Sequence, residues 1–472
     1  MLTETANEDS RLALWLRVRE YAVPPSMIET ATARRRAGDW AGACAAARID
    51  VDVLPRAVAR AHGTELAARL RADLRHLAPD LLRWHMPRVT PDGLLRPGLT
   101  LTLARYEATG ADGPYALHLV ARTPPAWADA GQRISLALWG GPRPAAGARS
   151  HPHPHPRPRP RFRLDLHRHL WDARRTDEFR IRSGADRPPA DRAAAPDPGP
   201  LPPGRPWATR RWAAEAELLL RAEGRATGTV TVRLGALDRL DLYVDGDAER
   251  DRFRYRLRDR DESADGAAAV PVLPDAATWV PPDLELLRAG LIPADRLHPL
   301  VASALVPGSS PDPTASPAAA ARRADGGAAP RVVDCRGARH RIGLVDGVLA
   351  PLDHDPAEIR REELLVALTG TPLPCLREID LAHRRPDCLA GVRERLDHGD
   401  TAGALAVVED LLGPDALLRG GALRDELEAA TARRIVHGLF RAGLLGPGPR
   451  RVLPGDGRPR EIRTHPRQAS RR

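Results

Sequence analysis

The chain has 472 residues and a formal net charge of +10, and all 72 of its basic residues are arginines because the sequence contains no lysine. The missing lysine excludes the usual P-loop NTPases, protein kinases, pyridoxal-phosphate enzymes and Schiff-base lyases, since each of them uses a lysine amine. The composition is typical of a high-GC bacterium, so codon supply explains part of the arginine excess. The 47 prolines and 39 glycines indicate long loops and linkers between folded parts.

The first 95 residues predict a helical N-terminal unit. Ser26 and Glu29 match the capping box S-x-x-E, which predicts a helix that starts at Ser26 and ends before Gly38. Asp39 then stands where it can cap a helix from Trp40 to about Arg48. A further helix is expected to bury a face formed by Leu66, Leu70, Leu74 and Leu77.

Residues 97–258 predict a β-rich domain. Several segments alternate polar and apolar residues without the repeating helices of a parallel α/β unit, so we expect an antiparallel sandwich or barrel. The segments are 99–107, 115–122, 133–139, 161–171, 178–182, 214–222, 227–234, 239–244 and 252–257. Proline-rich insertions interrupt them at 141–160 and 183–206, and Asp245-Gly246 predicts a hairpin turn.

The C-terminal part predicts a short helical connector at 259–306, a flexible linker at 307–330 and a second folded domain at 331–446. This domain is expected to be α+β and mostly helical, because a small predicted sheet precedes several helices. Asp355 stands before a proline, as the N-cap of the first of these helices would. Residues 447–472 predict a basic disordered tail. The expected fold class is therefore multidomain α+β.

The net positive charge lies in two segments. Residues 141–163 contain six arginines and no acid, and residues 446–472 contain eight arginines and two acids, so each segment carries +6. The rest of the chain sums to −2, and the expected folded parts are therefore close to neutral. Both segments are typical of a solvated linker and tail. A weak contact with a polyanion such as nucleic acid is the alternative interpretation.

One octapeptide occurs twice in similar form. GDWAGACA at 38–45 and GDTAGALA at 399–406 agree at six of eight positions, and each follows an arginine-containing helix. Each resembles the helix–turn–helix of one tetratricopeptide repeat, in which a glycine turn joins two antiparallel helices. The sequence lacks the tandem 34-residue array of such proteins, so two generic helical hairpins are the alternative interpretation.

The best candidates for metal ligands are Asp165, His167 and His169, in a segment that is predicted to be a strand. Alternate residues of a strand share a face and lie about 7 Å apart, so the three side chains would project together. Two imidazoles and a carboxylate can hold Zn²⁺ or Fe²⁺ with open coordination positions. The opposite face carries Phe162 and Leu164, so the plain interpretation is the solvent side of a half-buried sheet.

Other possible donors give weaker indications. Histidines alternate with prolines over 151–155, and an extended proline-rich backbone does not bring three ligands to one ion. Cys375, His383 and Cys388 lack the paired spacing of zinc ligands, and the cysteines are expected to be core residues. His354 lies between two aspartates, but adjacent residues of a turn seldom face one pocket. No cofactor is predicted.

The leading hypothesis is a cytoplasmic, non-catalytic interaction or accessory protein that assembles protein partners through tethered domains. The acidic start does not resemble a signal peptide, and no apolar run approaches the ~18 residues of a membrane helix. The four scattered cysteines fit a reducing compartment. The usual catalytic motifs are missing, so an enzyme is the less favoured class. The alternatives are a nucleic-acid-associated protein that uses the two arginine-rich segments, and a metal-dependent enzyme with its site on segment 161–171.

Overall fold

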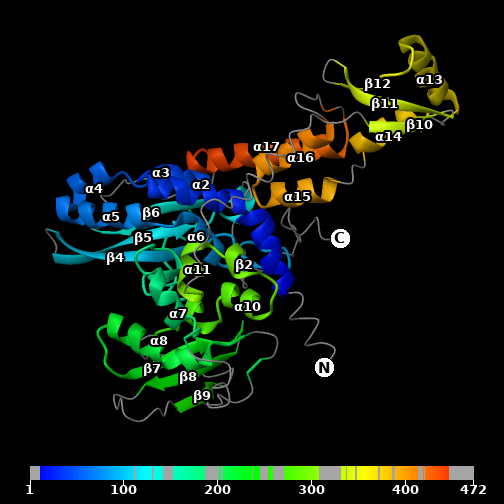
Figure 1. The fold of residues 1–472 in the computed structure, drawn as a ribbon. Coiled ribbons are helices and arrows are strands. Elements are labelled where there is room, and N and C mark those ends of the chain that lie inside the picture. The colour runs from blue at the N-terminus through cyan, green and yellow to red at the C-terminus, as the bar shows by residue number, and fades with distance from the viewer. Residues whose placement is uncertain are drawn as a thin grey trace, which may run out of the picture. The chain divides into compact units, whose positions relative to one another are not determined.

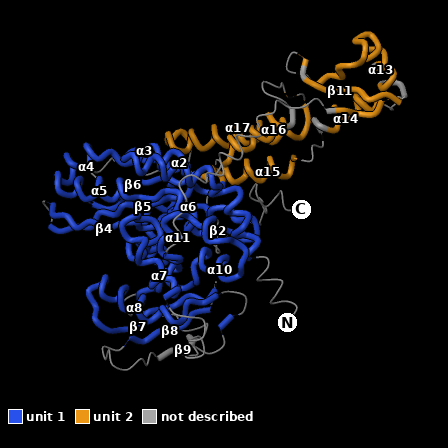
Figure 2. The backbone as a smooth tube through the Cα atoms, viewed as in Figure 1, with its two compact units in different colours: residues 1–126, 133–312 blue, residues 127–132, 313–472 orange. Residues whose placement is uncertain are grey.

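The computed structural model has a mixed α+β fold (Figure 1) and divides into two compact units (Figure 2). Unit 1 comprises residues 1–126 and 133–312, and unit 2 comprises residues 127–132 and 313–472. The structure describes residues 11–445 except 111–112, 130–131, 142–152, 187–200, 203–205, 236–237, 245–253, 259–269, 308–330, 336, 346–347, 370–372, 385–387, 413–417 and 419.

Unit 1 begins with helices, as predicted. A helix at 11–17 continues into the π-helix η1 (Val18–Ala22). The α-helices that follow are α2 (Pro25–Arg36), α3 (Trp40–Ala46), α4 (Pro55–His62), α5 (Thr64–His76) and α6 (Pro79–His85). The predicted capping box is wrong, because α2 starts at Pro25 and no side chain caps it. The four leucines of the predicted apolar face are buried, which confirms that face.

One hydrophobic core joins these helices to a four-stranded sheet. The sheet has the order β1-β6-β5-β4 and consists of β1 (Ile49–Val51), β4 (Thr100–Gly110), β5 (Gly113–Arg122) and β6 (Ile134–Gly140). Strand β1, which the sequence did not predict, pairs in parallel with β6, and the other pairs are antiparallel. Leu70 of α5 shares the core with Leu103 and Leu136 of the sheet. A short hairpin, β2 (Arg88–Val89) and β3 (Leu94–Leu95), and the 3-10 helix η2 (Ala126–Ala128) lie between these elements in the chain.

A second core within unit 1 lies between one helix and a three-stranded sheet. Helix α8 (Thr209–Ala222) packs Trp212 against β7 (Gly228–Arg233) and β8 (Arg239–Val244), and β9 (Arg254–Arg258) completes the antiparallel order β7-β8-β9. The last elements of the unit are α9 (Asp275–Thr278), α10 (Pro282–Arg288), η6 (Ala294–Arg296) and α11 (Pro299–Leu305). They confirm the prediction of short helices after residue 274.

Three predicted strands are wrong. Segment 161–171 forms turns and the 3-10 helix η3 (Arg168–Leu170), and segment 178–182 lies in η4 (Thr176–Glu178) and α7 (Phe179–Arg182). Segment 214–222 belongs to α8. The described strands form separate small sheets and no closed barrel. The Asp245-Gly246 turn, the tail after residue 445 and most of the predicted linker and insertions lie outside the described residues.

Unit 2 contains a small antiparallel sheet followed by helices, as predicted. The sheet has the order β10-β11-β12, with β10 (Arg331–Cys335), β11 (Ala338–Val345) and β12 (Val348–Pro351). The helices are α13 (Pro356–Thr369), α14 (Pro374–Arg384), α15 (Leu389–Asp397), α16 (Thr401–Leu412) and α17 (Ala422–Arg441). The Asp355 carboxylate accepts a hydrogen bond from the Ala357 N–H at 2.8 Å, which confirms the predicted cap. In the described part of both units, no helix has the length and apolar character needed to cross a bilayer.

The two similar octapeptides form the same local structure. Asp39 Oδ1 accepts from the Gly42 N–H at 2.8 Å, and Oδ2 contacts the Arg34 guanidinium at 2.8 Å. In unit 2, Asp400 Oδ1 accepts from the Gly403 N–H at 3.2 Å, and Oδ2 contacts the Arg395 guanidinium at 3.0 Å. At each glycine, an added Cβ atom would overlap the aspartate carboxylate. The shared pattern is therefore an arginine–aspartate pair whose carboxylate, in this rotamer, occupies the space of a Cβ atom three residues later.

This close contact predicts that the effect of Gly403→Ala on stability depends on whether Asp400 is present. Asp400→Ala is expected to cost about 1 kcal/mol, the usual value of an N-cap. Gly403→Ala should give no stabilisation in the native chain, because the methyl group displaces the cap, whereas in the Asp400→Ala background it should stabilise the helix by up to about 1 kcal/mol. Amide hydrogen exchange of α16 measures both effects. Equal stabilisation by Gly403→Ala with and without Asp400 would contradict this dependence.

Candidate metal centre

The structure does not bring the three predicted metal ligands to one point, although the His167 and His169 rings are neighbours with centroids 5.9 Å apart. Asp165 forms an ion pair with Arg163 at 2.9 Å. His167 lies with Nε2 3.2 Å from Glu215 Oε2, and its Nδ1 is 3.0 Å from the Arg163 carbonyl. The prediction assumed a strand, and the turns found here do not place alternate side chains on one face. The donor cluster that the described residues form lies elsewhere in the chain.

His169 is a core residue in this arrangement. It is 2 % exposed and its ring contacts Phe179, with ring centroids 5.8 Å apart. Burial, together with the nearby positive charge of Arg182, holds the pKa of His169 well below its ordinary value. The neutral imidazole therefore packs as an aromatic side chain beside the His167–Glu215 pair.

Three donors from separate elements of unit 2 converge on one point. Cys335 ends β10, His354 lies in the turn between β12 and α13, and Cys375 is the second residue of α14. The two sulfur atoms and one imidazole nitrogen all lie within 4.8 Å of one another. Both cysteines are completely buried, and the His354 side chain is 3 % exposed. Solvent is therefore largely excluded from the cluster.

The distance between the donor atoms fits a tetrahedral ion. Cys375 Sγ lies 3.6 Å from His354 Nε2. Zn–S bonds of about 2.3 Å and Zn–N bonds of about 2.0–2.1 Å at the tetrahedral angle also place sulfur and nitrogen about 3.6 Å apart. Two thiolates and an imidazole are ligands that favour Zn²⁺ over Mg²⁺ or Ca²⁺. The Cys375–His354 distance is therefore the one that a zinc ion bound to both atoms requires.

Neighbouring side chains orient His354. Its Nδ1 lies 3.4 Å from Glu358 Oε2, one helical turn into α13. A carboxylate at Nδ1 favours the tautomer that leaves the Nε2 lone pair free for a metal. His340 of β11 stacks on the other side, with ring centroids 4.1 Å apart and an interplanar angle of 22°. The imidazole is therefore held from two directions.

The Cys375 thiol favours the protonated form when no cation is bound. Burial and the adjacent Cys335 thiol raise the pKa of Cys375 to about 11. A bound metal ion would supply the positive charge that a buried thiolate lacks. The three donors occupy three positions of a tetrahedral ion, and the described residues place no fourth His, Cys, Asp or Glu in the cluster. The fourth position is thereby left to solvent or another ligand.

Other donors considered from the sequence have structural roles. His153 is buried, and its Nε2 contacts the Thr123 carbonyl at 2.9 Å. Burial lowers the pKa of His153 to about 4. Cys388 packs with the α15–α17 helices, while the side chain of His383 lies outside the described residues. Among the weaker candidates whose side chains the structure describes, Cys375 and His354 belong to the cluster.

Comparisons with known protein families, with curated proteins and with solved structures gave no match to this chain. A proposal about function therefore depends on the geometry of the molecule itself.

Proposed function

We propose that the chain is a zinc-binding, non-catalytic interaction or accessory protein, with the ion held by Cys335, His354 and Cys375. The convergence of these three buried donors carries the proposal. The ion would join the end of the β10–β12 sheet to the start of α14, which supports a structural role. Structural zinc sites usually have four protein ligands, so this role requires one more ligand beside the three donors. Small domains with few core residues commonly depend on such a cross-link.

The interaction role is supported by apolar side chains on the outside of unit 2. Leu364 on α13 is 68 % exposed, and Leu381 on α14 and Ile435 on α17 are 45 % and 60 % exposed. Contiguous apolar patches on a surface mark sites of contact with another protein, so these side chains are the ones to test for such a contact. A second domain in the same chain would raise the effective concentration of whatever the first domain binds. We infer a reducing, cytoplasmic compartment, because the proposed ligands must remain thiols.

Metal analysis tests the proposal directly. The protein should be expressed without a histidine tag and purified without chelators, and we expect about one zinc per chain by mass spectrometry of the metal. The double variant Cys335→Ser, Cys375→Ser should lose the zinc. The matched double variant Cys44→Ser, Cys388→Ser removes two other thiols and should keep it.

A second matched variant separates this site from the one predicted from sequence. His167→Asn combined with His169→Asn should leave the zinc content unchanged if the thiol cluster holds the ion. Loss of zinc in this variant, with retention in the Cys335→Ser, Cys375→Ser protein, would overturn the proposal and restore the metal-dependent enzyme hypothesis. Absence of stoichiometric zinc from the native protein would also overturn it.

A further inference from the structure

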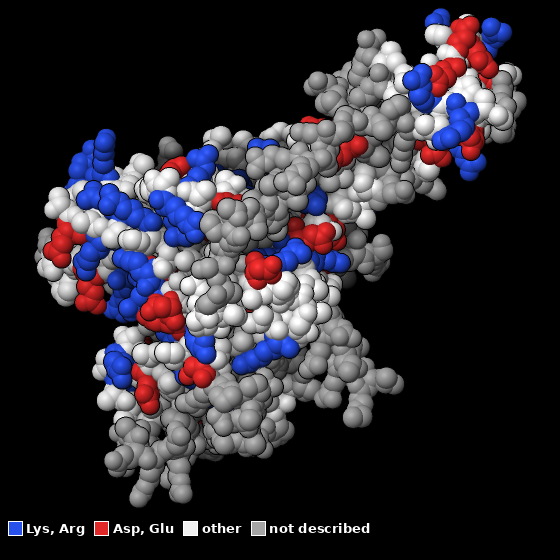
Figure 3. Space-filling view, in the orientation of Figure 1, with Lys and Arg blue, Asp and Glu red and all other residues white. Residues whose placement is uncertain are grey.

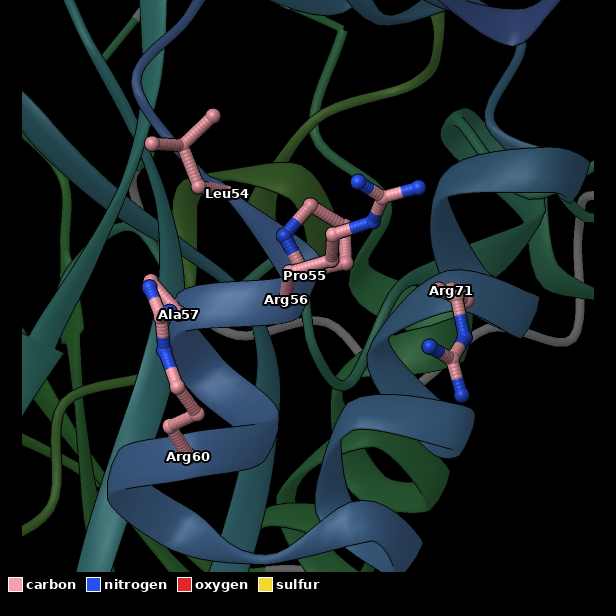
Figure 4. Close-up of a pocket in the computed structure, with 6 residues that line it drawn as sticks. All are labelled: Leu54, Pro55, Arg56, Ala57, Arg60 and Arg71. Atoms are coloured by element: carbon pink, nitrogen blue, oxygen red, sulfur yellow. The ribbon is translucent and has the colours of Figure 1, made fainter.

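A hollow lined by three arginines lies on unit 1, at the start of α4 and beside α5. Its volume is about 490 Å³, and its lining consists of Leu54, Pro55, Arg56, Ala57, Arg60 and Arg71 (Figure 4). Arg56 and Arg60 extend from α4, and Arg71 extends from α5. The lining contains no acidic residue. The hollow therefore combines three positive charges with an apolar floor.

These arginines differ from others in the same unit. Arg168 and Arg174 each form ion pairs with Asp73 and Asp172. Within the described residues, Arg56, Arg60 and Arg71 are exposed and have no hydrogen bond or ion pair with an acid. Each of these guanidinium groups is therefore available to pair with an anion.

The charge around the hollow has one predominant sign. Helices α4 and α5 expose five arginines and a single acid, Glu65. Figure 3 shows this basic surface over the two helices, with acidic side chains mainly at its border. The first turn of α4 also contains no acid, although acids usually stabilise that position through the helix dipole. The exposed surface of α4 and α5 is therefore net positive.

From these observations we infer that the hollow binds the phosphate of a nucleotide, either free or within a nucleic-acid strand. Guanidinium groups form paired hydrogen bonds with phosphate oxygens, and their planar faces stack on bases. Leu54 is 71 % exposed at the rim and offers an apolar surface to the sugar or base. The volume lies in the usual range for small-molecule sites, and the open form admits a strand as well as a single nucleotide. This site is independent of the proposed zinc centre.

Binding of two probes to the full chain tests the inference. The probes are AMP and a fluorescent single-stranded DNA of fifteen thymidines, each titrated at low salt. We expect the triple variant Arg56→Gln, Arg60→Gln, Arg71→Gln to bind the strand at least tenfold more weakly. Because each phosphate contact contributes about 0.7 to the slope of log affinity against log salt, the slope should fall by about 2.

A matched triple variant controls for the loss of charge. Arg221→Gln, Arg225→Gln, Arg239→Gln removes three exposed arginines elsewhere in unit 1 and should weaken strand binding less than threefold. If the native protein binds AMP but not the strand, and the Arg56→Gln, Arg60→Gln, Arg71→Gln variant loses AMP binding, the site is assigned to a free nucleotide. Binding of the strand, lost in the same way, assigns it to nucleic acid. Equal losses in both triple variants, or no binding of either probe by the native protein, would overturn the inference.

Discussion

Removal of the metal from unit 2 with a chelator is expected to abolish the ordered fold of β10–β12 and α14 while the core of unit 1 remains folded. The buried cluster in this part of unit 2 is small and consists of Cys335, Ile342, Leu373, Cys375 and Ile379. Two of its members are proposed ligands, so the ion contributes to the core itself. Structural zinc sites supply about 10–16 kcal/mol of apparent binding free energy, which is also folding free energy.

Hydrogen exchange with peptide resolution measures this effect. Amides of β10, β11 and α14 should exchange at least a hundredfold faster after chelation and recover when Zn²⁺ is added back. The Cys335→Ser, Cys375→Ser protein should match the chelated protein and fail to respond to zinc. Trp171 and Trp212, both buried in unit 1, should keep their fluorescence. Equal protection of β10 with and without the chelator would show that the ion has no structural role.

The sequence predicted those elements in which the spacing of apolar residues matches the face that is buried in the fold. Strands β4, β5 and β6 have alternating residues, and tertiary packing buries their apolar positions. Segment 214–222 misled the prediction because AEAELLLRA alternates at first and then contains three leucines in a row. In the folded protein the segment is helical, and the helix buries Trp212, Ala216, Leu219 and Leu220, which recur at helical spacing. A short apolar run does not distinguish these two periods.

Segment 161–171 misled the prediction for a different reason. Its alternation of arginine, apolar residues and histidine is strand-like, but several of its hydrogen bonds close within the segment. Arg163 binds Asp165, and the Trp171 indole donates to the Leu164 carbonyl at 2.9 Å. Such short-range hydrogen bonds stabilise turns at the expense of a sheet. The predicted metal site depended on the strand and lost its geometric basis with it.

The thiol cluster could not be predicted from spacing. Cys335, His354 and Cys375 are separated by about twenty residues on each side, whereas the zinc motifs that are recognisable in a sequence contain close cysteine pairs. Only the return of β12 beside β11 and the packing of α14 bring the three together. A weak signal was present, since His354 stands at a predicted turn immediately before a capped helix. Its partners, however, are set by tertiary structure.

Glu215→Gln is expected to destabilise unit 1 by about 3 kcal/mol at neutral pH. Glu215 is buried on α8 and receives two hydrogen bonds from the Arg182 guanidinium, beside His167. This ionic contact joins the helix of the second core to α7. Removing the carboxylate leaves Arg182, whose side chain is 11 % exposed, with only the longer and more exposed ion pair to Glu178 at 3.7 Å among the described residues. Loss of one partner of a buried pair costs about 3–5 kcal/mol. Urea denaturation followed by tryptophan fluorescence measures the difference.

The effect of this variant should depend on pH in a defined direction. Burial alone would raise the pKa of Glu215, but His167 and Arg182 overcome it and lower the pKa from 4.5 to about 2. A carboxyl group with a lowered folded-state pKa stabilises the fold above its unfolded pKa and loses that contribution as the pH falls through the folded value. The difference in unfolding free energy between the native protein and Glu215→Gln should therefore be present at pH 5 and disappear between about pH 4.5 and 2. Glu217 is exposed on the same helix, and Glu217→Gln should have the same unfolding free energy as the native protein at every pH. If Glu215→Gln remains equally destabilised down to pH 2, the variant has lost packing contacts and the ion pair is not the cause.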